Sequence, residues 1–385
     1  MQLKVKANFH ADKNQLIARY RLGTEQALGQ ADFLNSLDIN LIQALAIYLS
    51  VLQHTGEMKT AWILTGVLVR AAVSMKIHLD GTKFGTISLF DVQMRRRLWW
   101  QICLIDSKSE GSQLSAFKLS ESMFDTEKPA STDDKHLDPN MSEPALHARC
   151  WTGMSVFLLR CEIWSLSRQL QSAADVNHKR ELFKGEERRI EAAYLGNLDT
   201  TQPIQAFIST SVRLFLTKIK LMLLPRLRHS NSLQANEPVH AHEEYTFCLA
   251  VIDYTYALQN EPGWSGWRWQ IQGRQPPWNA LRVVIGHLSI SPWEPRYDQA
   301  LASVRRFLDS STEPSRVDPR YNDLRAQLSV VESIACQHHE GSSGSINMDG
   351  GGTWTEDWKL TSGRVEMDWQ AWNDIAGDLE LWAGI

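Results

Sequence analysis

The sequence lacks the cysteine spacing of a zinc site or of a disulfide framework. Its five cysteines are scattered over 385 residues, and no two of them stand at the Cys-x2-Cys spacing typical of zinc ligands. An odd number of scattered cysteines also argues against a disulfide scaffold and fits a reducing compartment. These residues therefore do not encode a cysteine-bound zinc cluster that could read DNA.

Long apolar runs are also missing. The N-terminal segment Met1–Lys6 has no apolar core of the kind that a signal peptide needs, and no later run is long enough to span a bilayer. We expect an intracellular protein with no membrane partner.

A basic surplus is absent as well. Lys and Arg number 40 against 44 Asp and Glu, which gives a formal net charge of −4. Because DNA-binding domains usually present a basic face to the phosphate backbone, contact with DNA is expected only indirectly, through a partner.

Motifs for catalysis and cofactor binding are missing too. The chain has no Walker A lysine, no GxGxxG after a strand and no GxSxG elbow, since Gly341 and Gly344 stand at the wrong spacing. The pair Asp133–Asp134 lies in a polar loop and is interpreted as turn or helix-capping residues. We predict that the chain is not an enzyme and has no catalytic residue and no cofactor.

Two groups of residues in the sequence contain potential zinc ligands. Both lie beside predicted loops, where His and Glu side chains are solvated, so no metal role is expected: His240, His242 and Glu243, and Cys336, His338, His339 and Glu340. Cys103 and Cys161 lie within apolar helical patterns and are expected to be buried, inert thiols.

Helical periodicity dominates what is present. Apolar residues recur at spacings of three and four, whereas alternating strand patterns are weak. The sequence predicts an all-α protein of roughly ten helices. The strongest predicted segments are Leu41–Leu52, Lys59–Ile77, Asp91–Ile105, Val156–Leu170, Ile204–Met222 (ended by Pro225), Cys248–Leu258, Trp278–Leu288, Tyr297–Leu308 and Tyr321–Val331.

Composition predicts three regions along the chain. A helical body covers residues 1–336, a linker rich in Gly, Ser and His covers 337–352, and an acidic, Trp-rich tail covers 353–385. Disorder is expected in part of the tail.

The tail contains a candidate activation or partner-binding segment. If this segment is helical, its apolar residues fall on one face, beside acidic residues and without basic ones; they are Trp369, Trp372, Ile375, Leu379 and Trp382. The alternative is a terminal helix packed on the body.

Four ordered motifs between about Gln30 and Met141 resemble the fungal-specific transcription factor domain, the middle region of fungal zinc-cluster transcription factors. They are Leu41-Ile42-Gln43-Ala44-Leu45; Ala61-Trp62 with Gly66, Arg70 and Ile77-His78-Leu79-Asp80; Arg95-Arg96-Arg97-Leu98-Trp99-Trp100 with Asp106; and Phe124-Asp125-Thr126 with Pro129 and Asp133-Asp134. Trp267–Gln270, Pro277–Leu281 and Pro295–Asp298 are similar to the family's C-terminal half. The family's Gly-Arg-Pro after the tryptophan helix has no counterpart.

The third motif is interpreted as a structural signature carried by Arg95, Arg97, Trp99, Trp100 and Asp106. We predict that an arginine such as Arg97 binds a carboxylate or loop carbonyls, and that Trp99 or Trp100 fills the core. Asp91 stands one turn before Arg95, where the two can pair.

The resemblance implies a nuclear regulator or co-regulator of a metabolic or secondary-metabolite gene set. Its expected partners are other transcription factors or a second copy of itself, with a small-molecule effector as a further expectation. Zinc is expected only if a six-cysteine cluster lies upstream. Two alternatives stay open: a helical enzyme or carrier in a biosynthetic pathway, and a truncated fragment of a full zinc-cluster factor.

Overall fold

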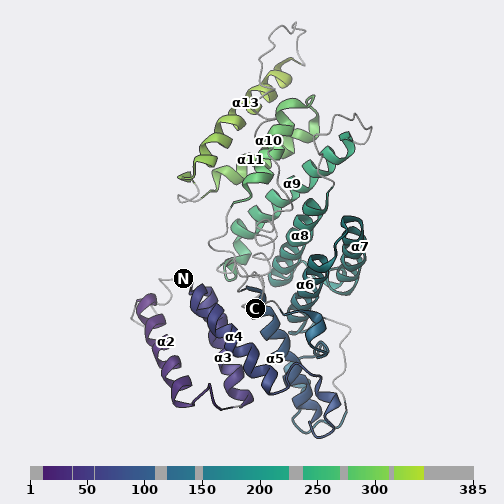
Figure 1. Ribbon diagram of the computed structural model, residues 1–385. Helices are drawn as coiled ribbons and strands as arrows, with labels where there is room; N and C mark the ends of the chain where they lie inside the picture. Colours follow the sequence, from purple (N-terminus) through teal and green to yellow (C-terminus); the bar gives the residue numbers. More distant parts are fainter. Residues whose placement is uncertain are drawn as a thin grey trace. The chain divides into compact units, whose positions relative to one another are not determined.

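The computed structural model describes residues 12–36, 38–55, 57–108, 119–143, 151–224, 237–268, 276–311 and 316–341. Within these ranges the chain forms eleven α-helices and several short 3-10 helices, with no strand. This confirms the predicted all-α class. The helices group into two compact units, the first ending at Ser172 and the second starting at Ala173 (Figure 1). Each unit is described by itself.

The first unit contains five α-helices. Helix α3 packs against α4 and α5, α5 packs against α6, and α2 lies along α3 (Figure 1). Their bounds are α2 Lys13–Gln30, α3 Ile39–His54, α4 Met58–Ser74, α5 Leu89–Lys108 and α6 Ser155–Ser172, with 3-10 turns at Gly81–Lys83, Glu121–Met123 and Asp134–His136.

Helix starts in this unit follow local capping chemistry. The Asp12 carboxylate accepts a hydrogen bond from Asn14 N at 2.8 Å at the start of α2. The Asp38 carboxylate accepts one from Asn40 N at 2.9 Å at the start of α3. Each bond satisfies an amide that the helix leaves without a partner.

The core of the first unit lies between α3, α4 and α5. The side chains of Leu49, Leu68 and Ile102 are completely buried, and Trp99 is 1% exposed. Burying an aliphatic side chain of this size stabilises the fold by about 1.5–3 kcal/mol. The apolar spacing in the sequence therefore describes the packed faces of α3 and α5 correctly. In α4 the packed face is Ala61, Leu68 and Ala72, whereas Val73 of the predicted stripe is 40% exposed.

The second unit contains six described α-helices. Helix α9 packs against α8, α10 and α11, while α13 packs against α10 and α11. Their bounds are α7 Val176–Ala193, α8 Pro203–Leu223, α9 Glu237–Asn260, α10 Trp278–Ile290, α11 Pro295–Asp309 and α13 Pro319–Gly341. Pro203 and Pro295 occupy the first turn of their helices, where a missing amide hydrogen costs nothing.

Eight of the nine predicted helical segments fall within observed helices, and α8 ends two residues before Pro225 as predicted. The ninth, Lys59–Ile77, extends three residues beyond α4, which ends at Ser74. Helices α2 and α7 had no predicted counterpart. The only buried residue of α2 is Leu28, so this helix lacks the broad apolar face from which a helix is recognised in a sequence. In α7 only Lys179, Phe183 and Ile190 are buried. No described helix has the length and apolar content needed to cross a membrane.

Candidate functional site

Three consecutive arginines on α5 bind three separate segments of the first unit. Because successive residues of an α-helix lie about 100° apart around its axis, Arg95, Arg96 and Arg97 project in different directions. One helix can therefore hold the turn after α4, the 3-10 turn at Gly81–Lys83 and the loop that follows residue 119.

Arg95 stabilises the turn that ends α4. Its Nη2 donates to the carbonyl oxygens of Met75 and Lys76, at 2.9 and 2.8 Å. Lys76 has a φ of 56°, which is a left-handed conformation that glycine adopts more readily than other residues. The predicted pairing of Arg95 with Asp91 is replaced by these contacts, and the Asp91 carboxylate accepts a hydrogen bond from Ser88 Oγ at 2.7 Å.

Arg96 and Asp80 form a buried, two-pronged ion pair. Arg96 Nε and Nη2 donate to the two Asp80 oxygens at 2.8 and 3.0 Å, and the side chains are only 11% and 3% exposed. The same carboxylate accepts the backbone N–H of Thr82 and of Glu127. Burial alone would raise the pKa of Asp80, but the hydrogen bonds from Arg96, Thr82 and Glu127 outweigh it and hold that pKa well below its usual range.

Arg97 reaches the loop before α6. Its Nη1 donates to the Asp134 carboxylate at 2.6 Å and its Nη2 to the Thr132 carbonyl at 3.4 Å. A carboxylate and a loop carbonyl are the partners that the sequence predicts for an arginine of this run. Asp133 precedes the Asp134–His136 turn and accepts a hydrogen bond from Gly153 N at 2.8 Å, in agreement with its interpretation as a turn residue.

The tryptophans of the signature belong to an aromatic cluster. Trp99 and Trp100 both pack edge-on against Phe124, with ring centroids 5.4 and 5.6 Å apart, and Trp100 also contacts Trp164 of α6 at 5.6 Å. Trp100 Nε1 donates to the carbonyl oxygen of Glu127 at 3.1 Å. Both tryptophans are thus buried, and the cluster fixes Phe124 and its loop between α5 and α6.

Asp106, the last signature residue, accepts a hydrogen bond from Leu119 N at 3.2 Å. All five signature residues therefore contact other segments of the same unit. These contacts support a role in holding loops on α5, which is the structural interpretation of the motif.

Sequence reasoning missed the pair at the centre of this arrangement. Asp80 ends the second of the four sequence motifs. Its partner Arg96 is not among the predicted signature residues, which include Arg95 and Arg97 instead. Gly81, beside Asp80, is also required, because an added Cβ would lie 3.0 Å from a Val92 methyl carbon. The signal available was the pattern of Asp followed by Gly after a helix, which predicts a turn.

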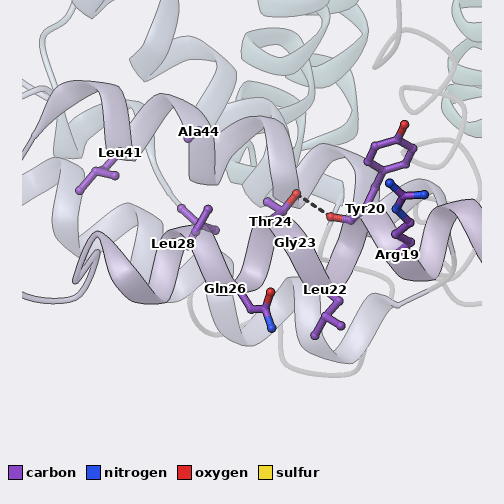
Figure 2. Close-up of a pocket in the computed structure, with 10 residues that line it drawn as sticks. Arg19, Tyr20, Leu22, Gly23, Thr24, Gln26, Leu28, Leu41 and Ala44 are labelled. Carbon is purple, nitrogen blue, oxygen red and sulfur yellow. Dashed lines mark hydrogen bonds between the residues drawn. The ribbon is translucent and has the colours of Figure 1, made fainter.

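An open groove lies between α2 and α3. Small residues line it at Gly23, Ala27 and Ala44, and Figure 2 shows Leu28 and Leu41 at one end with Arg19 and Tyr20 at the other. The lining is mainly apolar, which is unusual for a solvent-facing surface.

The exposed face of α3 extends this apolar surface. Ala44, Ile47 and Val51 follow one another at spacings of three and four, and the last two are 68% and 52% exposed. On α2, Tyr20 is 62% exposed. A helix of another protein that carries its own apolar stripe is the kind of partner that such a surface accommodates.

A second ring cluster lies in the other unit, where α9, α10 and α11 meet. The rings of Tyr245 and His287 are 4.4 Å apart, and His287 Nε2 lies 3.2 Å from Tyr297 Oη. Burial, followed by the nearby charges of His242 and Arg296, lowers the pKa of His287. This ring is therefore neutral at physiological pH.

Metal and thiol chemistry find little support in the described part of the chain. It holds no group of three His, Cys, Asp or Glu residues able to hold a metal. His240, His339 and Glu340 of the two candidate groups lie outside the described side chains. Cys103 and Cys161 are buried as predicted, and burial raises the pKa of both thiols, which makes them poor nucleophiles.

The tail residues Trp369, Trp372, Ile375, Leu379 and Trp382 lie outside the described residues, as does the predicted linker beyond 341. Their assignment as a partner-binding segment stays a prediction. The region boundaries at 336 and 352 are likewise predictions.

The first unit is thus a helical domain whose arginine-tryptophan helix, α5, binds the loops around it. Residues 6–145 match the family profile of the fungal specific transcription factor domain, and this part of the chain is such a domain.

Curated relatives extend the similarity into the second unit. The chain is 27% identical over 332 residues to the aurofusarin cluster transcription factor of Gibberella zeae, a match that covers 80% of this chain and 48% of that protein. It is 26% identical over 302 residues to a C6 finger domain transcription factor of Aspergillus fumigatus, covering 72% and 37%. The pyriculol/pyriculariol biosynthesis cluster transcription factor 1 of Pyricularia oryzae is 36% identical over 126 residues, covering 33% and 17%.

The chain thus spans less than half the length of these relatives. No solved structure matches it significantly.

Proposed function

We propose that this chain regulates transcription of a fungal biosynthetic gene set, in the nucleus, through protein partners and not as an enzyme. The observation that carries the proposal is the 332-residue similarity to a cluster transcription factor, which covers 80% of the chain and so includes both helical units. If the similarity reflected only the domain at residues 6–145, it would be confined to the first helical unit.

The groove between α2 and α3 is the proposed partner surface. Its floor is apolar, and the exposed Arg19 lines it beside Tyr20. This combination fits an amphipathic helix of another transcription factor with acidic residues next to its apolar stripe, because the acids would face Arg19 while the stripe covers Ala44 and Ile47. A small-molecule effector is a further part of the proposal.

Deletion of the gene tests the central claim. We expect coordinated loss of transcripts from one set of biosynthetic genes, restored when the chain is supplied again. An unchanged transcript profile under conditions where those genes are expressed would contradict a regulatory role.

The partner surface has its own test in a reporter assay, with the chain fused to a heterologous DNA-binding domain. Ile47→Glu should reduce reporter output and capture of the partner, because it places a charge in an apolar contact. Ile290→Glu is the matched control, since Ile290 is also an exposed apolar residue of a helix, 75% exposed, but lies on α10. Equal effects of the two variants would exclude the groove as the partner surface. If Ile47→Glu instead abolishes self-association, the partner in the groove is a second copy of this chain.

A further inference from the structure

One face of α4, which we call the α4 stripe, combines exposed apolar side chains with exposed cations. Ile63 and Val73 are 52% and 40% exposed, and Lys59 and Arg70 are exposed as well. Because successive residues of an α-helix lie about 100° apart around its axis, these four side chains fall within a stripe about 80° wide. The stripe is about 21 Å long, which is about four helical turns.

Gly66 lies within the α4 stripe and contributes no side chain to it. The guanidinium Nη1 of Arg70 lies 3.4 Å from the position that a Cβ at Gly66 would take. The Arg70 side chain therefore runs back along α4 toward Ile63, and its charge lies beside apolar surface. Lys76, in the turn after α4, is also exposed and adds a third cation at this end of the helix.

Carboxylates that would neutralise these three cations are missing from their surroundings. Residues 58–79 contain no Asp or Glu, and α3, which packs against α4, contains none either. Glu57, which precedes this segment, binds Arg21 at 2.9 Å. Asp80, which follows it, binds Arg96. Within the described residues, the three cations make no ion pair.

The charge of the α4 stripe determines which kind of partner fits it. A second copy docked through the same stripe would bring two sets of cations together across a two-fold axis, which is repulsive. DNA carries a phosphate about every 1.7 Å along its axis, and the widely spaced cations would meet few of them while Ile63 and Val73 faced a polar backbone. A helix with acidic residues beside its own apolar stripe satisfies both the cations and the apolar side chains.

We propose that the α4 stripe is a docking site for an acidic amphipathic helix of a partner protein. The partner's carboxylates face Lys59, Arg70 and Lys76, and its apolar side chains cover Ile63 and Val73. This site is separate from the groove between α2 and α3, because none of its residues lines that groove. Its role at a promoter rests on the proposed function, whereas docking itself is measured with purified components.

The probe is a fluorescein-labelled synthetic peptide of about 15 residues, with Leu at the helical spacing of three and four and Glu at the flanking positions. A second peptide carries Gln in place of every Glu and keeps only the apolar stripe. Fluorescence anisotropy with the purified full chain should show saturable binding of the Glu peptide, with an affinity that falls several-fold as the salt concentration is raised. The Gln peptide should bind at least about tenfold more weakly, because it loses several ion pairs at once.

Variants of the α4 stripe should weaken binding of the Glu peptide. Arg70→Gln and Lys59→Gln should each lower the affinity about threefold to fivefold, the effect of one exposed ion pair. Ile63→Gln should lower it at least about fivefold, because an apolar side chain that the peptide would bury is lost. Arg188→Gln and Ile290→Gln are the matched controls on exposed helix residues of the second unit, and they should bind normally.

Binding in the groove between α2 and α3 is measured separately. Each variant is also made in an Ala27→Glu background, which places a negative charge in that groove, and binding to the α4 stripe should persist there. If Ala27→Glu abolishes binding while Arg70→Gln and Ile63→Gln bind normally, the peptide occupies the groove and the proposal is wrong.

Three other results would overturn the proposal. The first is the absence of saturable binding of the Glu peptide to the wild type. The second is an equal effect of the α4 variants and of their controls. The third is a different occupant, indicated by tighter binding of duplex DNA than of the Glu peptide or by loss of self-association in Ile63→Gln. Peptide binding together with an unchanged transcript profile would refute the proposed function and leave the docking site standing.

Discussion

The buried pair between Asp80 and Arg96 allows a sharp test of how the first unit is held together. Replacing Asp80 by Asn keeps the shape of the side chain and removes its charge. The change leaves Arg96 with one ionic partner, Glu127, whose side chain is 70% exposed. It also puts an amide NH2 among groups that already donate to Asp80, including the backbone N–H of Thr82.

The expected loss in free energy of unfolding follows from the burial of the pair and from the number of partners that Arg96 keeps. Removing one member of a buried ion pair costs about 3–5 kcal/mol, because the remaining charge stays in a low-dielectric surrounding. Since Arg96 keeps Glu127, we expect the lower end, about 3 kcal/mol. With a urea dependence of about 2 kcal/mol per molar, the unfolding midpoint of the first unit should fall by about 1.5 M.

Hydrogen exchange of α5 peptides in increasing urea is the suitable assay, because it reports on the first unit separately from the second. Asp138→Asn is the control, as Asp138 is an exposed residue of the same loop region. A midpoint shift no larger than that of the control would refute the reasoning about the pair.

The pH dependence gives an independent check on Asp80. Because the pKa of Asp80 is lowered in the folded state, its stabilising contribution is complete above its unfolded pKa of about 3.9 and is lost as the pH falls below it. The difference between wild type and Asp80→Asn should therefore be constant from pH 7 to 5 and should shrink below about pH 4.

Three further predictions concern other parts of the chain. Trp100→Ala should lower stability by about 3–5 kcal/mol by emptying the space between Phe124 and Trp164, and an unchanged melting temperature would sink that role. Because the pKa of His287 is lowered, wild type should lose stability relative to His287→Gln as the pH falls below about 6.5, measured by urea unfolding at pH 7.5 and 5.5. Deleting residues 353–385 should reduce reporter activation with no change in body stability; a large stability loss would instead support a packed terminal helix.

The fold class and the core of the first unit could be predicted from sequence because they depend on local periodicity. Residues such as Leu49, Leu98 and Ile102 sit on apolar faces that repeat every three or four positions, and they are buried. Helix α2 could not be predicted in this way, because only Leu28 of that helix is buried.

Contacts between segments that are distant in the sequence could not be predicted from periodicity. Arg96 meets Asp80 across 16 residues and Glu127 across 31. Periodicity shows which residues share a helix face, but not which loop will fold over that face. The partner of each of the three adjacent arginines is therefore set by the tertiary structure and not by the periodicity of the sequence.

Two arginines of the first unit should contribute to its stability with opposite signs, and the same substitution to methionine at each position tests this. Arg96→Met should destabilise the unliganded protein by about 3 kcal/mol or more, because it abandons the buried carboxylate of Asp80. Arg160→Met should be neutral or stabilising, because it abandons no described partner and removes a desolvation cost. Equal destabilisation by the two changes, measured by thermal unfolding of the full chain, would mean that Arg160 is already compensated. Opposite signs would mean that the charge of Arg96 stabilises the first unit, whereas the buried charge of Arg160 costs stability.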